Sequence, residues 1–149
     1  MFHNMLSIGE GKMPHQSREK EQTISSYSIK TRKRATLAVI CSPFKLNLFV
    51  TMAKISLPLP QIAGSQSVEK GYTYKPNPEP KVEQELMWLI KVGILRREVD
   101  GQGITDSFRL TPLGRQVIAQ WGVNSELPRA TWKDHLVNLY SRLLNFSLY

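Results

Sequence analysis

The sequence contains a single cysteine, Cys41, among its 149 residues. One thiol can form neither an internal disulfide nor a cysteine-rich zinc cluster, so both kinds of cross-link are excluded. Because Cys41 lies in an apolar run, we interpret it as a buried structural thiol rather than a nucleophile. Histidine is also scarce, with His3 and His15 near the start and His135 far from both. We therefore expect no metal site.

Long apolar runs are absent as well. No stretch approaches the roughly 18 apolar residues that a membrane-spanning helix needs. The first residues lack the apolar segment of a secretory signal, and Glu10, Glu19 and Glu21 argue against an organelle transit peptide. We expect a soluble protein with no membrane partner, in a reducing, cytoplasmic setting.

Catalytic motifs are missing too. The sequence GEGK at 9–12 lacks the first glycine, the following hydroxyl residue and the preceding strand of a phosphate-binding loop. The sequence GQG at 101–103 lacks the third glycine of a dinucleotide site and is typical of a turn. Glu83 and Glu85 share one short predicted helix but point apart. The sequence thus predicts a non-enzymatic protein without catalytic residues or a cofactor.

Positive charge is what the sequence has in excess. Twenty lysines and arginines stand against twelve acidic residues, which gives a formal net charge of +8. Such a balance favours an acidic partner: nucleic acid first, then an anionic membrane surface or an acidic protein. A soluble protein that merely carries a basic tail is the alternative. The basic run KTRKR at 30–34 could contact phosphates or form the solvated first turn of a helix.

The pattern of the first half predicts a tail followed by helices. Residues 1–24 are polar and aperiodic, which indicates a disordered basic or polar tail. Residues 25–146 are predicted to form one domain, mainly α-helical with a small β-hairpin. Its first helix begins near Ile29 with Ser28 as cap, and a second, apolar helix spans 42–55 with Ser42 as cap. A short third helix in SLPLPQIAGS is expected to end at Gly64.

An irregular stretch at 65–79 follows, in which prolines and a glycine exclude a continuous helix. Its bulky residues, Tyr72 and Tyr74, either pin the stretch to the domain or contact a partner. The next helix starts at Pro80 and ends at Gly93. Its Trp88 would be a good interface anchor if exposed. The alternative is that Trp88 is buried against the final helix.

A hairpin at 94–110 is predicted next, with DGQG at its turn. Strand alternation places Leu95 and Val99 on one face and exposes Arg96 on the other. Thr111 then caps a helix that begins with Pro112. A final helix at 129–146 carries one apolar stripe, which either packs on its own domain, as we favour, or forms a homodimer. The residues of this stripe are Trp132, Leu136, Leu139, Tyr140 and Leu143.

The stretch LMWLIKVGILRREVDGQGITDSFRLTPLGR, residues 86–115, resembles winged helix-turn-helix regulators. In those proteins a recognition helix ends at a glycine, and a basic strand, a wing and an aromatic strand ending in "LT..G" follow. The corresponding parts here are Gly93, ILRRE, DGQGITDS, FRL and TPLG. The resemblance implies a winged-helix-like domain with extra N- and C-terminal helices. From about Ile29 onward the chain also resembles a small uncharacterised family associated with cyanobacterial genomes, which implies no activity.

The winged-helix resemblance also implies where DNA would be bound. In DNA-binding members the recognition helix reads base edges and the wing touches phosphates or the minor groove. The matching residues are Lys81, Gln84 and Lys91 on the helix and Arg96, Arg97 and Arg109 on the wing. Two features depart from the pattern: Glu83 and Glu85 are unfavourable near phosphates, and the 65–79 connection is unusually long.

Two functions therefore stand as hypotheses. The first is a nucleic-acid-binding, transcription-regulator-like module with DNA as partner. The alternative is a winged-helix protein–protein interaction adaptor that does not bind DNA, with Trp88, Tyr72 and Tyr74 as contacts. What separates them is whether the wing arginines form one basic surface with Lys91 or are paired by Glu98, Asp100 and Asp106.

Overall fold

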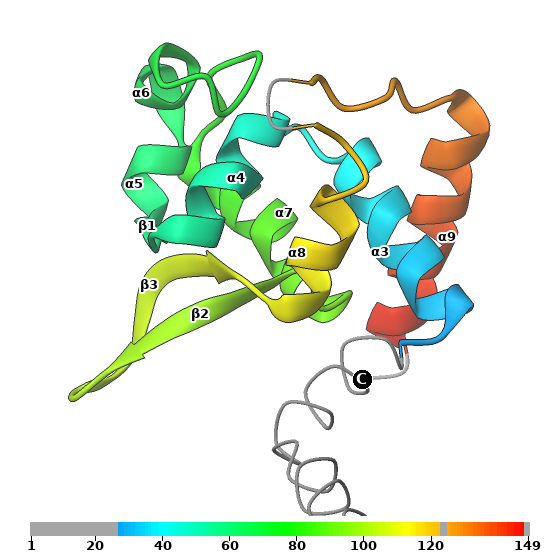
Figure 1. Cartoon of the computed structure of the whole chain (residues 1–149). Coiled ribbons are helices and arrows are strands. Elements are labelled where there is room, and N and C mark those ends of the chain that lie inside the picture. Colours follow the sequence, from blue (N-terminus) through cyan, green and yellow to red (C-terminus); the bar gives the residue numbers. More distant parts are fainter. Residues whose placement is uncertain (1–26, 123–124, 148–149) are drawn as a thin grey trace, which may run out of the picture.

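The computed structural model describes residues 27–122 and 125–147, so the predicted tail at 1–24 lies outside the described residues. The fold is mainly helical with a small antiparallel sheet, as the sequence predicted (Figure 1). The elements are α3 (Ile29–Cys41), α4 (Leu46–Lys54), β1 (Leu57–Pro58), α5 (Leu59–Ile62), α6 (Gly64–Glu69), α7 (Glu79–Lys91), β2 (Leu95–Asp100), β3 (Gly103–Leu110), α8 (Pro112–Ile118) and α9 (Trp132–Ser147).

The sheet has three strands in the order β1-β3-β2, both neighbours antiparallel. β1 was not predicted, because its two residues lie inside a stretch with the apolar spacing of a helix. Its Leu57 pairs with Phe108, and Pro58 pairs with Ser107. A proline is tolerated there because β1 is an edge strand, where a missing N–H group breaks no central ladder.

The hairpin forms as predicted, but two side chains of its first strand do not lie on the same face as predicted. Asp100 pairs with Gly103 across the turn, and the Asp100 carboxylate accepts a hydrogen bond from the Gln102 N–H at 2.7 Å. Between Arg97 and Val99 the register shifts, as in a β-bulge. The shift reverses the alternation, so Val99 is 63% exposed while Leu95 is buried. The prediction that these two side chains share a face was therefore wrong.

The start of the second helix was also predicted too early. Ser42 does not cap α4 but ends α3, and its hydroxyl donates to the Val39 carbonyl at 2.7 Å. The chain then runs extended, and the Lys45 N–H donates to the Tyr72 carbonyl at 2.8 Å. This contact with the distant loop, which no local pattern shows, delays the helix until Leu46.

The long connection before α7 contains a helix of its own. α5 ends at Ile62 with Ala63 as its C-cap, so Gly64 follows the helix end, as predicted, with a φ of +67° that favours glycine. The next helix, α6, begins at this same residue. Tyr72 is buried and pins the segment, as one of the two interpretations held. Tyr74 is 61% exposed, and the Lys45 ammonium group lies 4.8 Å from its ring centre. The two tyrosines thus have different surroundings.

The junction of α7, the hairpin and α8 is built as predicted. α7 has Pro80 in its first turn, and Gly93 follows its end with a φ of +89°. Thr111 caps α8 by accepting from the Gly114 N–H at 3.0 Å, and its hydroxyl contacts the Gly93 carbonyl. A Cβ atom at Gly114 would lie 2.4 Å from the Ile94 carbonyl oxygen, so only glycine fits. These contacts fix the hairpin relative to α7.

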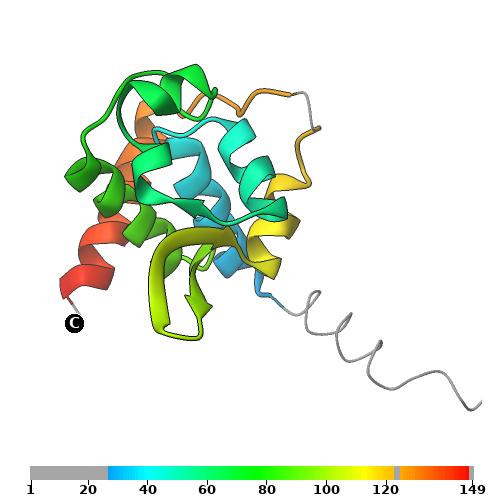
Figure 2. The ribbon, with the colours of Figure 1, turned by 90° about the vertical axis from the view of Figure 1, so that its left-hand side faces the viewer.

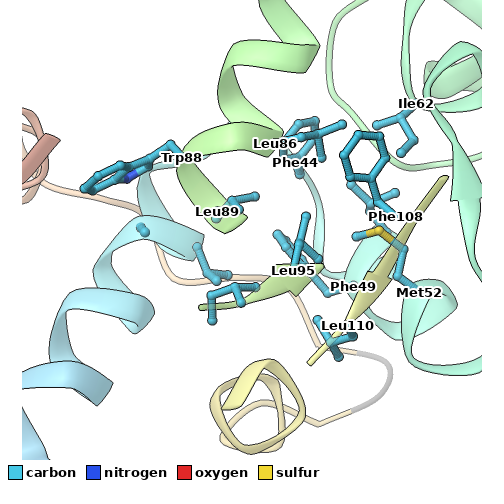
Figure 3. Close-up of a cluster of buried hydrophobic side chains, with 14 of the residues drawn as sticks. Phe44, Phe49, Met52, Ile62, Leu86, Trp88, Leu89, Leu95, Phe108 and Leu110 are labelled. Atoms are coloured by element: carbon cyan, nitrogen blue, oxygen red, sulfur yellow. The ribbon is translucent and has the colours of Figure 1, made fainter. Parts of the chain in front are cut away.

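A hydrophobic cluster lies between α4, α7 and the sheet (Figure 3). α7 contributes Val82, Leu86 and Leu89, all fully buried. None of the described side chains of α9 belongs to this cluster, and the residues of its apolar stripe are more than half exposed. The favoured prediction that this stripe packs on its own domain was therefore wrong. α9 packs instead beside α3 at the periphery, while the hairpin points away from the body on the other side in this view (Figure 1).

Candidate functional site

The surface on which the resemblance places DNA is formed by α7 and the hairpin, which lie side by side (Figure 2). Arg97 of β2 joins the two elements. Its Nη2 lies 3.7 Å from a Glu83 oxygen and 3.3 Å from the Met87 sulfur, both on α7. Its guanidinium also lies 5.2 Å from the centre of the Phe108 ring. Arg97 is therefore a packing residue, and only 24% of its side chain is exposed.

Each wing arginine is paired with a carboxylate. Arg97 Nη1 lies 3.0 Å from an Asp106 oxygen. One carboxylate, Glu98, serves the other two: its oxygens lie 3.4 Å from Arg96 and 3.7 Å from Arg109. Arg96 is exposed, as strand alternation predicted. The arginines are thus paired off by Glu98, Asp106 and Glu83, and they do not form a basic surface free of carboxylates.

This pairing matters for charge more than for stability. Ion pairs at a surface contribute about 0–1 kcal/mol, so these do not hold the wing in place. They do, however, set three carboxylates beside three guanidinium groups. A phosphate approaching the wing would meet both signs of charge at short range. The wing therefore attracts anions weakly for its arginine content.

α9 contacts the helix that the resemblance assigns to base reading. Lys81, Gln84 and Lys91 of α7 are exposed, as is Met87, which was not predicted. The Lys91 ammonium group donates to the Asn145 carbonyl of α9 at 3.4 Å.

A second residue of α9 reaches further toward the start of α7. Arg142 Nη1 lies 3.2 Å from both oxygens of Glu85. Its Nη2 donates to the Gln84 carbonyl at 3.4 Å. These contacts place α9 along one flank of the predicted reading helix.

Trp88 is buried rather than exposed, with only 2% of its surface accessible. Its indole N–H donates to the Asn138 side-chain oxygen at 3.0 Å, and the Arg142 guanidinium lies 5.8 Å from its ring. Figure 3 shows Trp88 set apart from Leu86 and the other labelled core residues. The hypothesis of an exposed anchor at Trp88 is therefore wrong, and its alternative, burial against the final helix, holds.

The start of α3 is the second basic region. Lys30, Arg32 and Lys33 are exposed, and Arg34 is half-buried. No aspartate or glutamate among the described residues forms an ion pair with any of the four. A groove of about 570 Å³ between α3, α8 and α9 has Arg32, Lys33 and one carboxylate, Asp134, among its lining residues. Within the described part of the chain, the four cations of this region thus outnumber the one carboxylate beside them.

Arg115 of α8, another basic residue, has a structural contact instead. Its Nη2 donates to the Ala53 carbonyl at 2.7 Å, near the end of α4. Residues 1–26 contain three basic and three acidic residues, so the net charge of +8 belongs to the rest of the chain. A basic tail does not explain it.

The Cys41 thiol and the possible metal ligands were the remaining candidates for chemistry in the described part of the chain. Burial raises the pKa of Cys41 to about 11, and the nearby Asp134 carboxylate adds to the rise. A thiol with such a pKa is a poor nucleophile near neutral pH. Within 27–122 and 125–147, no three histidine, cysteine, aspartate or glutamate residues are placed to hold a metal ion. None of the helices described has the length and apolarity to cross a bilayer.

The described chain is thus a small mainly helical protein with a three-stranded sheet and two basic regions, one paired and one not. Its sequence matches the family described as Npun_F0494-like over residues 25–142, and the chain belongs to this family. The resemblance noted from about Ile29 onward agrees with that match. No curated protein matches the chain. No solved structure matches it either.

Proposed function

We propose that this protein is a non-enzymatic, winged-helix-like module that binds nucleic acid, with DNA as the first candidate, and that the start of α3 makes the phosphate contacts. The observation that carries the proposal is the group of four basic residues at 30–34, none of which forms an ion pair with a carboxylate of residues 27–122 or 125–147. Nucleic acid attracts such a group through the release of counterions.

The place of these residues on the helix supports the proposal. A helix N-terminus carries a partial positive charge, so each exposed cation there costs about 0.3–1 kcal/mol of helix stability. The first turn of α3 contains no acidic residue to offset this. An anion bound nearby would remove the cost. A functional contact with phosphate explains the run better than a solvated helix start does.

The arrangement of elements supports the winged-helix part. The order of elements is a helix, a short edge strand, two short helices, the longer helix α7 and the hairpin. The edge strand pairs with the second strand of the hairpin. In winged-helix regulators this order brings one helix and the wing to the DNA. Here the wing cations are paired, so we assign the wing a positioning role. A transcription-regulator-like role in the cytoplasm would follow from DNA binding.

The test is binding of a fluorescent random duplex, followed by anisotropy at several salt concentrations. We expect micromolar affinity at low salt. Replacing Lys30, Arg32 and Lys33 together by Gln should weaken it at least about tenfold and lower the slope of log K against log salt by about 2–3. The matched control removes three exposed cations elsewhere, with Lys54, Lys75 and Arg129 changed to Gln. Equal losses of affinity in both variants would show that binding depends on net charge alone and not on the start of α3. If the wild-type protein does not bind the duplex, the proposal is wrong.

A protein adaptor remains the second candidate because α9 occupies one flank of α7 and the wing is charge-paired. An acidic protein would then meet the cations of α3. Competition separates the two: polyglutamate should displace duplex DNA poorly from a nucleic-acid-binding protein at equal charge concentration. Displacement as effective as that by unlabelled duplex would favour the adaptor.

A further inference from the structure

α9 turns its apolar side to solvent. Its side chains toward the body are polar and half-buried: Asp134, Asn138, Ser141, Arg142 and Asn145. Six large apolar side chains of α9 are between 51% and 69% exposed: Trp132, Leu136, Val137, Leu139, Tyr140 and Leu143. Val137 lies at the edge of this set, where it also lines grooves beside α3. We call these six residues the outer face of α9. No described element of the chain covers them.

The outer face is large enough to hold two chains together. Taking roughly 200 Å² for a whole aromatic side chain and roughly 120 Å² for a leucine or valine, the six at this exposure present on the order of 500 Å². The largest apolar patch on a monomeric protein is usually about 300–600 Å². A stable interface buries about 800 Å² on each partner. The face is therefore as large as the largest apolar patch of a typical monomer, the kind that is often functional, and it supplies well over half of the area that one partner of a standard interface buries.

The spacing of the residues in the outer face fits packing against α9 of a second copy of the chain. Trp132, Leu136, Leu139 and Leu143 follow one another at steps of four, three and four, which is the heptad seam of paired helices. In an antiparallel pair centred between Leu139 and Tyr140, Leu136 meets Leu143 of a second copy. Two such contacts arise from one two-fold axis. The face is thus complementary to itself, as a symmetric dimer requires.

The charge of the outer face also favours a second copy of the chain as the partner. Among the exposed described residues of α9, Lys133 is the one with a fixed charge. A face this neutral has no attraction for an acidic or basic partner surface, and it meets no repulsion from its own copy. The polar side of the helix, which on membrane-binding helices carries many cations, is here turned to α3 and α7.

We propose that the occupant is a second copy of this chain, with α9 packed antiparallel against α9 in a two-fold symmetric dimer. The dimer does not depend on nucleic-acid binding. Each copy carries a net charge of +8, and salt screens the repulsion between the copies. The dimer therefore tightens or stays constant as salt increases, whereas binding to nucleic acid or to anionic lipid weakens.

The experiment is sedimentation equilibrium of the full chain from about 1 to 100 µM, at low and high salt. We expect a mass of twice 17.0 kDa at the higher concentrations. Changing Leu136 and Leu143 together to Gln should raise the dimer dissociation constant at least about 100-fold. Circular dichroism should show an unchanged fold, because neither residue belongs to the core. The matched control changes Val99 and Ile104 to Gln, two exposed apolar residues of the hairpin, and leaves the dimer intact.

Cross-linking tests the orientation. In a Cys41→Ser background, a chain with Leu136→Cys should cross-link to a chain with Leu143→Cys but not to itself. Self-cross-linking of the Leu136→Cys chain alone would overturn the antiparallel arrangement.

Three results would overturn the dimer. The wild-type chain could remain a monomer throughout the concentration range. The Leu136 and Leu143 variant could dimerise as the wild type does. A monomer could bind phosphatidylserine vesicles through these two leucines, which would make the outer face a membrane contact.

Discussion

α7 and α9 are both amphipathic helices, and the structure places them in opposite ways. α7 turns its apolar side inward, where Val82, Leu86 and Leu89 are fully buried between α4 and the sheet. α9 turns its apolar side outward, and Leu136 and Leu143 stay more than half exposed. The difference shows that a stripe at helical spacing identifies an amphipathic helix, while it does not tell which side the rest of the chain will cover.

The reason lies in what each helix packs against. α7 fills the space between elements whose facing residues are apolar, so burial of area drives its position. α9 faces polar groups on the other side of α7, namely the indole N–H of Trp88, the Glu85 carboxylate and the Lys91 ammonium group. Its own polar residues satisfy these groups. Directional contacts thus position α9, and its apolar side is left for another partner.

The largest test of this comparison is a pair of leucine truncations. Leu86→Ala should lower the free energy of unfolding by about 2–5 kcal/mol, because it opens a cavity in the core. Leu136→Ala on α9, at a concentration where the chain is monomeric, should cost less than about 0.5 kcal/mol. Urea denaturation followed by circular dichroism measures both. Similar losses at the two sites would break the comparison.

A second test concerns the polar contact that orients α9. Trp88→Phe keeps most of the apolar volume but removes the N–H donor to Asn138, which should cost about 1–2 kcal/mol. A double-mutant cycle with Asn138→Ala should then give a coupling of about 1 kcal/mol. Without measurable coupling, the hydrogen bond would not be what holds α9 against Trp88.

The smallest predicted effect is on the alkylation rate of Cys41, which depends on how often α9 detaches from the rest of the domain. Cys41, Asn138 and Arg142 line one surface groove, and burial raises the pKa of the Cys41 thiol to about 11, with Asp134 adding to the rise. Arg142→Met should loosen α9 and speed alkylation of Cys41 a few-fold, within an upper bound of about 100-fold. The control Lys133→Met, on the solvent side of α9, should leave the rate unchanged. Equal rates in all three proteins would mean that α9 does not protect the thiol.

The pH dependence of that alkylation shows in which direction the pKa of Cys41 is shifted. The thiolate is the reactive form, so in the wild-type protein the rate should rise about tenfold for each pH unit up to the pKa of about 11. In Arg142→Met the same rise should level off at a lower pH. A wild-type rate that levels off near pH 9 would contradict the raised pKa.

The parts of the fold that local rules govern were predictable. The cap at Ser28, the boundaries of α7, the hairpin turn and the cap at Thr111 all depend on residues within one turn of each other. The second helix start was wrong because Phe44 pairs with Thr73, far away in the sequence. The face of Val99 was wrong because a shift in register depends on the partner strand.

The candidate site was harder to predict, because charge depends on pairing. The sequence shows where Arg96, Arg97 and Arg109 lie but not that Glu98 serves two of them, nor that Glu83 reaches Arg97 from α7. The basic run at 30–34 lies in a stretch that contains no acid between Glu21 and Glu69, and the carboxylate beside it, Asp134, comes from the distant helix α9. The lack of nearby acids is a sequence signal that could have singled out this run.

By itself, the sequence determined the number and type of most elements, the excess of positive charge and the existence of two apolar stripes, because these follow from residue type and spacing. Only the tertiary structure decided which stripe is buried, which cations lie beside a carboxylate and whether Trp88 is exposed. Burial and ion pairing each need two partners, and the partners here are separated by up to tens of residues along the chain, as Trp88 and Asn138 are.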